Sequence, residues 1–416
     1  MTPENGCVID GIPNEWETKR LHQVAEIRSG VAKNSNIEVS DPISVHYLRV
    51  ANVQDGYLDL SEMSKIKISR SNLTRFAVLP GDVLMNEGGD LDQLGRGALW
   101  QGQYSPCVHQ NHVFVVRCGR SVTAEFLSHW TGSETAKSYF LVGGKQTTNL
   151  ASINKTALGL LPVAVPPPDE QRAIAEALSD VDALLGVLDR MLTKKRDLKQ
   201  AAMQQLLTGQ TRLPGFKDEW AETQIGPHID LLTGYPFPSS KYAESGIRLL
   251  RGSNVKRGET DWSDDLIQCW PEITPSIRQF ELQAGDLVIA MDGSLVGRSY
   301  ARLCESDLPA LLLQRVARLR SSAIDIGYLT QHVGSEYFIK YCDSVKTVTA
   351  IPHISPSDIR NFRVPLPPTM AEQTAIAEVL SDMDAEIAAL ERRREKTQDL
   401  KQGMMQELLT GKTRLI

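Results

Sequence analysis

Residues 170–213 read EQRAIAEALSDVDALLGVLDRMLTKKRDLKQAAMQQLLTGQTRL, and residues 372–415 read EQTAIAEVLSDMDAEIAALERRREKTQDLKQGMMQELLTGKTRL. At a fixed offset of 202 residues, 27 of these 44 positions are identical. Internal self-similarity of this kind indicates a repeated architecture. The chain is therefore expected to consist of two similar halves.

Each copy of this repeat predicts one long helix. Thr369 and Glu372 form a capping box at the start of the second copy, and Asp169 is a candidate cap for the first. Gly209 and Gly411 follow the last apolar residues and suit the left-handed position just beyond a helix end. About 39 residues with a rise of roughly 1.5 Å each make a rod of roughly 58 Å.

Apolar residues recur along each predicted helix at alternating steps of four and three. They are Ile174, Leu178, Val181, Leu185 and Leu188 in the first copy, and Ile376, Leu380, Met383, Ile387 and Leu390 in the second. This spacing is typical of a coiled-coil seam, so each helix needs a helical partner. The simplest partner is the other copy, packed antiparallel, and the two halves are then related by a pseudo-two-fold axis.

A charged stretch follows each seam, at residues 193–197 (TKKRD) and 392–396 (RRREK). Such a stretch is usually a solvated helix face. The functional alternative is that it docks partner subunits or contacts DNA phosphates.

The segments between the helices repeat faintly. Matching features at offsets of 202 to 204 residues are Trp16 and Trp220, Gly30 and Gly234, Gly81-Asp82 and Gly285-Asp286, Leu48-Arg49-x-x-Asn52-Val53 and Leu250-Arg251-x-x-Asn254-Val255, and Gly95-Arg96 and Gly297-Arg298. The order is therefore globular head, helix, head, helix. We expect an α+β fold with two globular heads, at residues 1–165 and 212–366, and two antiparallel coiled-coil helices, at 166–211 and 367–416.

Local patterns place short strands and helices in the heads. In the first head we expect strands at Tyr47–Val53, Val83–Asn86, Ala98–Gln101, His112–Arg117 and Leu161–Val165, and helices at Thr123–Leu141 and Ser152–Leu158. In the second, Ser355-Pro356-x-Asp358 predicts the start of the matching short helix. The helices are nearly duplicated and the heads have diverged. This contrast indicates a protein whose two halves need the same geometry but two different binding specificities.

Composition and charge indicate less about function than the repeat does. The 416-residue chain is 41% hydrophobic and 23% charged, without an apolar run long enough for a membrane span or a signal-like start, so we expect a cytoplasmic protein. Its six cysteines and eight histidines show no zinc spacing, which indicates free, mostly buried thiols and no metal site. A net charge of −6 means that any DNA binding must rely on local basic clusters or on basic partners.

Candidate DNA-binding residues are chosen by side-chain chemistry, since Arg and Lys read guanine edges while Asn and Gln read adenine. They are Arg49, Arg96, Lys145, Gln146, Thr148 and Asn149 in the first head, and Arg251, Lys256, Arg257, Arg298, Lys346, Thr347, Thr349 and His353 in the second. Several lie in glycine-rich loops, which let the backbone approach DNA closely. The alternative is an ordinary glycine turn beside a surface arginine. The recurring Arg49-Asn52 and Arg251-Asn254 pairs have a structural alternative, in which they cap a strand.

Catalytic motifs are missing from the sequence. There is no phosphate-binding Gly-x-x-x-x-Gly-Lys-[Ser/Thr] loop, no Asn/Asp-Pro-Pro-Tyr/Phe methyltransferase motif, no Gly-x-Ser-x-Gly and no His-Glu-x-x-His. Acidic pairs such as Asp264-Asp265 are typical of loops. We therefore predict no catalytic residue in this chain.

The whole chain resembles the specificity subunit of type I restriction-modification systems. The resemblance rests on the two proline-rich entries into Glu-Gln-x-x-Ile-Ala (Pro166 to Ala175 and Pro365 to Ala377), the two Leu-Leu-Thr-Gly exits and the Gly-Asp strands. It implies that each head recognises one half of a bipartite, asymmetric double-stranded DNA site, that the helices set the gap, and that two methyltransferase subunits and restriction subunits are partners. S-adenosylmethionine, ATP and magnesium are then expected on those partners and no cofactor in this chain.

Two other hypotheses stay open at this point. One is an enzyme that cuts or methylates DNA alone, against which the missing motifs argue. The other is a coiled-coil adaptor whose heads bind proteins without DNA specificity, against which the diverged heads argue.

Overall fold

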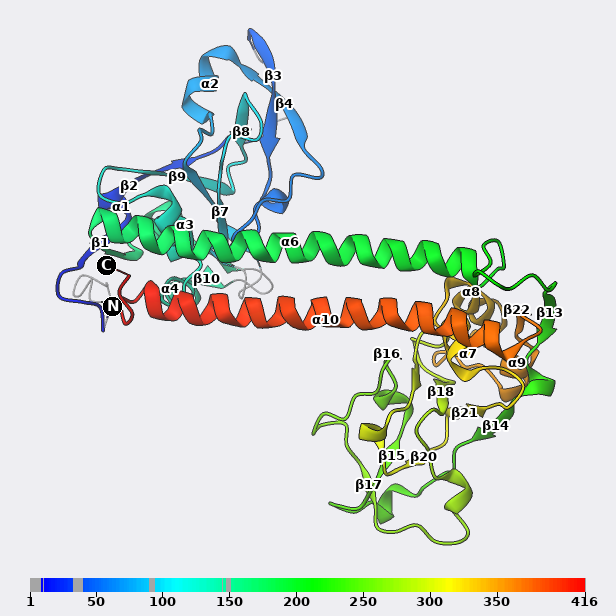
Figure 1. The fold of residues 1–416 in the computed structure, drawn as a ribbon. Coiled ribbons are helices and arrows are strands. Elements are labelled where there is room, and N and C mark those ends of the chain that lie inside the picture. Colours follow the sequence, from blue (N-terminus) through cyan, green and yellow to red (C-terminus); the bar gives the residue numbers. More distant parts are fainter. Residues whose placement is uncertain are drawn as a thin grey trace. The chain divides into compact units, whose positions relative to one another are not determined.

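The computed structural model describes residues 9, 11–32, 40–89, 94–143, 145–146 and 151–415. The chain divides into two compact units, Met1–Asp189 with Arg393–Ile416, and Arg190–Arg392 (Figure 1). Each unit holds one head and one part of each long helix, α6 (Pro168–Leu206) and α10 (Met370–Leu408). Both helices have 39 residues, so the predicted length is confirmed.

The first head is built on small sheets and short helices. Its strands are β1 (Glu17–Arg20), β2 (Ala25–Ser29), β3 (Pro42–Leu48), β4 (Ser64–Ser69), β5 (Asp82–Asn86), β6 (Gly88–Gly89), β7 (Gly97–Leu99), β8 (Cys107–His109), β9 (Val113–Cys118), β10 (Lys145–Gln146), β11 (Ala151–Ser152) and β12 (Pro162–Val165). Its helices are α1 (Leu21–Val24), α2 (Arg70–Phe76), α3 (Ala124–Thr131), α4 (Glu134–Gly143) and α5 (Lys155–Gly159). The central sheet has the order β2-β9-β5-β7, beside β4-β3-β8.

The second head repeats this plan. Its strands are β13 (Ala221–Gln224), β14 (Asp230–Thr233), β15 (Ile247–Leu250), β16 (Arg257–Gly258), β17 (Cys269–Trp270), β18 (Leu287–Ala290), β19 (Tyr300–Arg302), β20 (Ala310–Leu312), β21 (Val316–Arg320) and β22 (Arg363–Leu366). Its helices are α7 (Ile326–Val333), α8 (Glu336–Val345) and α9 (Pro356–Asn361). The sheet order β14-β21-β18-β19-β16 matches β2-β9-β5-β7 with one added strand, and β17-β15-β20 matches β4-β3-β8. The α+β class and the internal repeat are confirmed.

The two long helices run antiparallel within each unit. In the first unit Asp182 pairs with Lys401 at 2.6 Å and Asp189 pairs with Arg394. In the second unit Lys199 pairs with Asp384, Lys195 with Glu386 and Arg196 with Glu391. Several residues of the two charged stretches therefore form ion pairs between the helices, a role that the sequence pattern did not reveal.

The Glu-Gln that opens each long helix fastens it to the rest of its unit. Glu170 accepts hydrogen bonds from Trp16 at 3.0 Å and from Arg414 at 2.8 Å. Gln171 accepts a hydrogen bond from the Thr123 amide at 2.8 Å, at the start of α3. The following Ile174, like its counterpart in the second unit, is buried in the core of the head.

The second unit repeats these contacts. Glu372 accepts hydrogen bonds from Arg212 at 2.7 and 2.8 Å and from Trp220 at 3.2 Å. The Asp325 amide donates to Gln373 at 2.9 Å, at the start of α7. The carboxylate raises the pKa of Arg212 above its usual range, since it stabilises the guanidinium. The Glu372 side chain is occupied by Arg212 and Trp220, so it does not complete the predicted capping box. The box keeps one of its two hydrogen bonds, from the Glu372 amide to the Thr369 hydroxyl at 3.4 Å.

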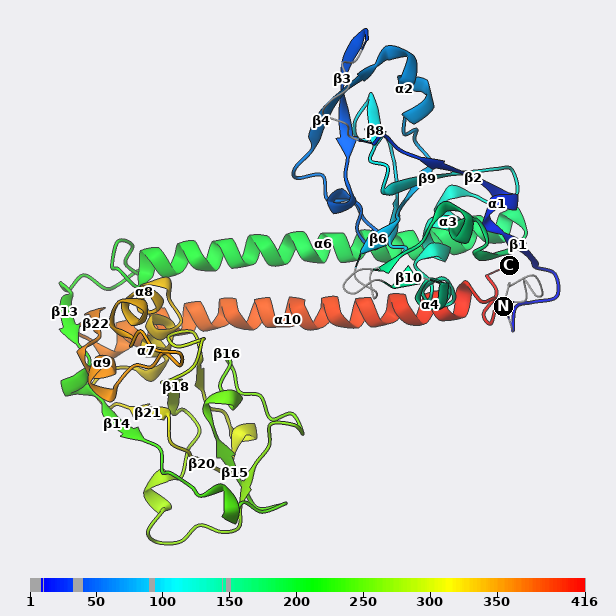
Figure 2. The same ribbon diagram turned by 180° about the vertical axis from the view of Figure 1, so that it is seen from behind.

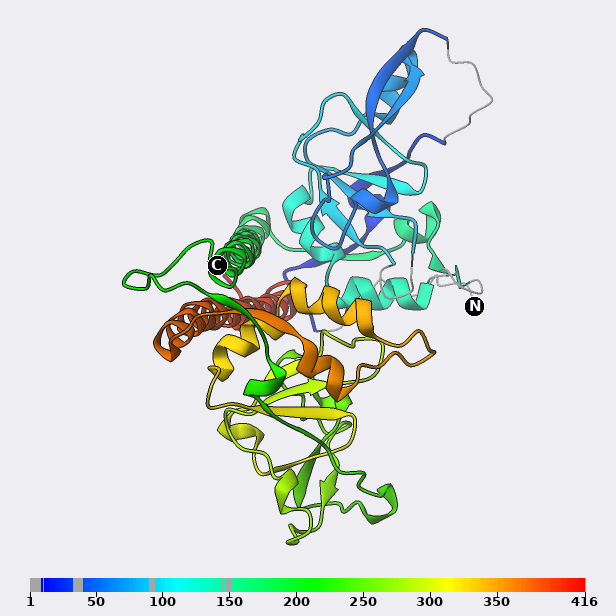
Figure 3. The ribbon, with the colours of Figure 1, turned by 90° about the vertical axis from the view of Figure 1, so that its right-hand side faces the viewer.

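Short helices lie between each sheet and the long helices. In Figures 1 and 2, α3 and α4 lie against the first part of α6 and the last part of α10, where Phe126 and Leu127 share a buried cluster with Ile174 and Leu408. Figure 3 shows α8 and α9 beside the start of α10. The single helix predicted over Thr123–Leu141 is wrong, because it breaks at Gly132 into α3 and α4.

Other sequence predictions differ from the structure by small shifts. The strand expected over Tyr47–Val53 is displaced, since β3 ends at Leu48 and a 3-10 turn, Val50–Asn52, follows. Asp169 lies in the first turn of α6, which begins at Pro168, and is not its cap. Gly209 and Gly411 have φ of 71° and 69°, so their predicted left-handed conformation is confirmed.

The heads differ at one buried position on the helix that packs against α6 and α10. In the first head the Trp130 indole donates to the Pro162 carbonyl at 3.0 Å. In the second head His332 occupies the matching place, and a hydrogen bond of 2.6 Å reaches a different carbonyl of the matching strand, from Tyr328 to Pro365. The His332 side chain is fully buried with Nε2 unpaired, and burial lowers its pKa to about 3.

We predict that His332 makes the second unit sensitive to acid. Between its folded pKa of about 3 and its ordinary value of 6.5, only the unfolded chain binds the proton, so stability is lost as the pH falls through this window. His332→Phe should remove about 2 kcal/mol of the loss between pH 7 and pH 5. Urea denaturation of the full chain at both pH values measures this, with His228→Phe as the control; equal pH slopes for parent and variant contradict it.

Candidate nucleic-acid interface

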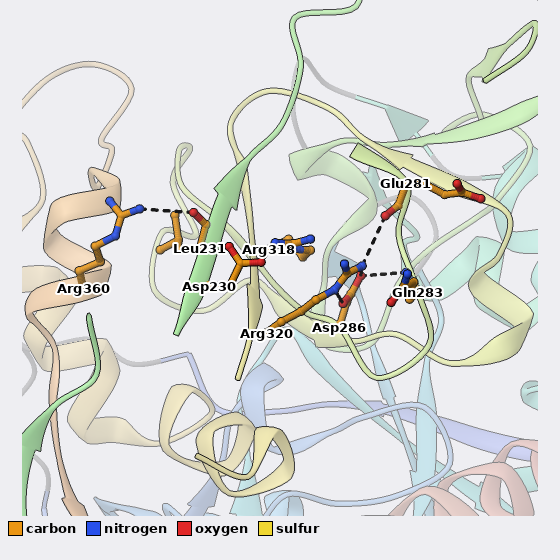
Figure 4. A network of polar contacts seen from close by, with 8 residues as sticks. All are labelled: Asp230, Leu231, Glu281, Gln283, Asp286, Arg318, Arg320 and Arg360. Atoms are coloured by element: carbon orange, nitrogen blue, oxygen red, sulfur yellow. Dashed lines mark hydrogen bonds and ion pairs between the residues drawn. The ribbon is translucent and has the colours of Figure 1, made fainter. Parts of the chain in front are cut away.

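The aspartate of each Gly-Asp pair forms a clamp with an arginine inside its head, and Figure 4 shows the clamp of the second head. Asp286 accepts a bidentate contact from Arg320 and a hydrogen bond from the Gln283 amide at 2.8 Å. In the first head Asp82 accepts two hydrogen bonds of 2.7 Å from Arg117. Both aspartates are buried, and their hydrogen bonds raise the pKa of the two arginines. The clamp joins the start of β5 to the end of β9, and the residue before β18 to the end of β21, and so fixes the pairing of these strands.

The recurring Arg-Asn pairs have internal partners in both heads. Asn52 is buried, accepts from the Arg49 amide at 2.9 Å and donates to the Asp59 carbonyl at 2.8 Å. Asn254 makes the same contacts with Arg251 and Asp261. The guanidinium of Arg49 donates to the Glu62 carbonyl at 3.1 Å, and that of Arg251 to Leu266. This geometry favours the structural alternative for both pairs, although direct DNA contact by the arginines stays a prediction.

The glycine-loop arginines are half-buried at the edge of each head. Arg96 donates to the Gln54 side chain at 3.2 Å, and Arg298 pairs with Asp343 at 3.4 Å. Gly95 precedes Arg96 with φ of 74°, and a Cβ there would lie 2.3 Å from the Phe140 ring. Gly95, and Gly297 beside Cys342 in the second head, are therefore closely packed, and each precedes its arginine.

The structure brings most of the second head's candidates together in one loop. Lys346 pairs with Asp343 at 2.6 Å, next to Arg298. The Thr347 hydroxyl contacts Thr349 at 3.2 Å and His353 at 2.9 Å. Arg298, Lys346, Thr347, Thr349 and His353 therefore form one group, which we name the loop cluster.

The remaining candidates lie elsewhere. Lys256 pairs with Asp261 at 3.4 Å, and Arg257 faces Glu336 of α8 at 4.0 Å. In the first head Lys145 and Gln146 form β10, which pairs with β11. Thr148 and Asn149 lie outside the described residues.

Each unit also has a groove where its head meets the two long helices. The first groove has a volume of about 570 Å³ and is lined by residues that include Asp55, His129, Asp182, Lys401 and Met405. The second has about 960 Å³ and is lined by residues that include Arg257, Gln331, Asp384, Lys199 and Met203, which occupy the matching positions at the offset of 202. The charge at one position on the head side is reversed between the two, since Asp55 is replaced by Arg257.

Chemically reactive groups are sparse in the described part of the chain. No cluster of three His, Cys, Asp or Glu side chains there could hold a metal ion. Burial raises the pKa of Cys107 and of Cys342 to about 12, which makes both thiols poor nucleophiles at neutral pH. No helix among the same residues is long and apolar enough to cross a membrane.

Comparison with known proteins gives a consistent family. The family described as type I restriction modification DNA specificity domain matches residues 13–190 and 272–399. The type I restriction enzyme MjaVIII specificity subunit of Methanocaldococcus jannaschii is 29% identical over 67% of this chain and 68% of its own length. The putative MjaX specificity subunit of the same organism is 24% identical over 98% of this chain and 96% of its own.

Two solved structures share the fold. The S subunit of a type I restriction-modification system from M. genitalium superposes with a TM-score of 0.61 at 12% identity, covering 98% of this chain and 99% of that one. A chain from a study of the complex assembly and conformational transition of a type I system gives a TM-score of 0.52 at 19% identity, covering 96% and 98%. The chain therefore belongs to the family of type I restriction-modification DNA specificity subunits, which are non-catalytic.

Proposed function

We propose that each head of this chain reads one half of a bipartite, asymmetric DNA site, while α6 and α10 set the gap and dock the methyltransferase subunits. Family membership assigns the chain DNA sequence specificity in a restriction-modification system. The observation that carries the finer proposal is that two units of one plan present different polar side chains at matching exposed positions. Two such heads suit two different half-sites.

Base recognition is assigned to the edge of each head that carries its glycine-loop arginine. The loop cluster of the second head combines arginine, lysine, threonine and histidine side chains, and Arg96 is the counterpart of its Arg298 in the first head. Because both heads carry a slight excess of acidic residues, the neutralisation of DNA phosphates depends on such local groups and on partner subunits. A coiled-coil adaptor without DNA specificity finds no support among the relatives.

The partners of the complex are two methyltransferase subunits and restriction subunits. S-adenosylmethionine, ATP and magnesium belong to these partners. The two grooves are equivalent places for two copies of one methyltransferase subunit, since each has an Asp–Lys pair between the long helices at the same position.

An exposed apolar stripe on α6 supports partner docking. Leu184, Val187, Met191 and Leu198 are between 38% and 48% exposed and recur at steps of three, four and seven. This spacing places them on one helix face, the arrangement of a second coiled-coil seam. Exposed apolar side chains in a row are typical of a protein interface, so a helix of the methyltransferase subunit is the expected occupant.

We predict that charges on this stripe weaken assembly without unfolding the chain. Val187→Lys with Met191→Lys places two lysines in the proposed interface and should raise the Kd for the methyltransferase subunit by at least about 10-fold. Size-exclusion chromatography and titration calorimetry of the full chain measure it. Asp197→Lys with Ala201→Lys, at exposed positions on another face of the same helix, is the matched control; an unchanged Kd for the stripe variant excludes the stripe from the interface.

We predict that cells expressing this chain with its methyltransferase subunit gain methylated adenine in a split motif with a fixed gap. Single-molecule sequencing of their DNA detects it. Replacing residues 17–165 by the corresponding head of a relative should change one half of the motif only. An assembled complex that adds no modified motif contradicts the proposed function and favours the protein-binding adaptor.

A further inference from the structure

Three segments of the second head meet beyond the ends of β18 and β21. The amide of Met291, just after β18, donates to the carbonyl of Arg315 in the β20–β21 turn at 2.8 Å. The Ile354 amide donates to the Met291 carbonyl at 2.9 Å, and the Gly293 amide to Pro352 at 3.0 Å. The turn, the stretch after β18 and the loop cluster therefore form one continuous surface.

The first head has the same junction. The Glu87 amide, just after β5, donates to the carbonyl of His112 in the β8–β9 turn at 2.9 Å, and the Ile153 amide donates to the Glu87 carbonyl at 2.8 Å. These bonds match those of Met291, Arg315 and Ile354. His112 and Arg315 thus occupy one structural position, which we name the turn position.

The turn position carries a basic group opposed by an acid in both heads. Arg315 faces Asp292 with 3.9 Å between Nε and Oδ2, and His112 faces Glu87 with 2.6 Å between Nδ1 and Oε2. The side chains of Arg315 and His112 are 62% and 56% exposed. A basic side chain facing an acidic one is therefore kept at this position, while the residue types differ.

Interactions that hold the heads together do not differ in this way. The aspartate–arginine clamp and the buried Asn52 and Asn254 have the same residue types and partners in both heads. A position that is fixed by the backbone, exposed to solvent and chemically different is one where specificity changes without loss of stability. The turn position meets all three conditions.

Arg315 also has a strained backbone. Its φ is 74°, and only one other described residue apart from glycine, Asp41, has a positive φ. A branched or long side chain in this region costs about 1 kcal/mol, and such strain is found mainly at functional sites. The Gln314 amide fixes the turn through a 3.0 Å bond to the Tyr235 carbonyl.

The chemistry around Arg315 suits the edge of a base pair. At 3.9 Å its contact with Asp292 is longer than a hydrogen bond, so the guanidinium fork is available for O6 and N7 of guanine. Leu295 and Val348, from the two neighbouring segments, are 58% and 103% exposed. Apolar side chains on the same surface suit contact with thymine methyl groups.

We propose that the turn position is the base-reading position of each head: Arg315 contacts guanine in one half-site, and His112 contacts a base in the other. Asp292 and Glu87 are positioning residues that orient these side chains before DNA binds. This inference rests on the proposed function, and it names two residues outside the set chosen from the sequence, which does not include Arg315 or His112.

The test uses the full chain assembled with its methyltransferase subunit and a randomised duplex library. Methylated molecules are sequenced to obtain the preference at every position of both half-sites. Arg315→Gly should lower discrimination at one base pair of one half-site by roughly 10- to 100-fold and leave the other half unchanged. His112→Ala should do the reverse, and Asp292→Asn should reduce discrimination at the Arg315 position only.

Folding and non-specific effects are controlled within the same head. Glycine adopts a positive φ without steric strain, so Arg315→Gly should keep the melting temperature of the parent or raise it. Arg278→Ala removes an exposed arginine that belongs to none of the three segments and should leave the motif unchanged. A bipartite parental motif that Arg315→Gly leaves intact overturns the inference and keeps the proposed function, whereas a parent complex without any motif overturns the proposed function itself.

Discussion

The buried glutamate at the start of each long helix is the interaction on which the architecture depends. Glu170 and Glu372 each hold an arginine from the segment that follows the other long helix, together with a tryptophan from the start of a head. One carboxylate therefore joins three parts of the chain that are far apart in sequence. The glutamine beside it accepts a hydrogen bond from the start of α3 in the first head and of α7 in the second, so these two residues attach each head to its long helix.

This arrangement explains why the helices are repeated so closely. The carboxylate sets which residues of α6 face which residues of α10, and the interhelical ion pairs follow that register. Exposed ion pairs of this kind contribute little stability individually, at most about 1 kcal/mol each. They match the antiparallel register, while the apolar residues from Ile174 to Leu178 and from Ile376 to Leu380 bury the helices in the head cores.

The sequence predicts what depends on periodicity and fails where tertiary contacts decide. Helix length and helix ends followed from the repeat and from Gly209 and Gly411, because these signals are local. The break at Gly132 was missed, since apolar spacing continues through it while the chain turns. The turn position was missed for a related reason: His112 and Arg315 match at an offset of 203 residues, and only the backbone bonds of the folded heads reveal that they occupy the same place.

Stability and specificity are carried by separate sets of residues in this fold. Buried polar groups are costly to change because their partners would lose their hydrogen bonds, which explains why the clamp and the Arg-Asn turn have the same residues in both heads. Exposed groups at the ends of β5 and β18 carry no such cost. The exchange of Trp130 for His332 shows the limit of this freedom: Tyr328 donates to another carbonyl of the matching strand, and an imidazole nitrogen is left unpaired. In such a head, the recognised base changes most easily at a position that is held by backbone hydrogen bonds. A substitution there removes no side-chain contact on which the fold depends.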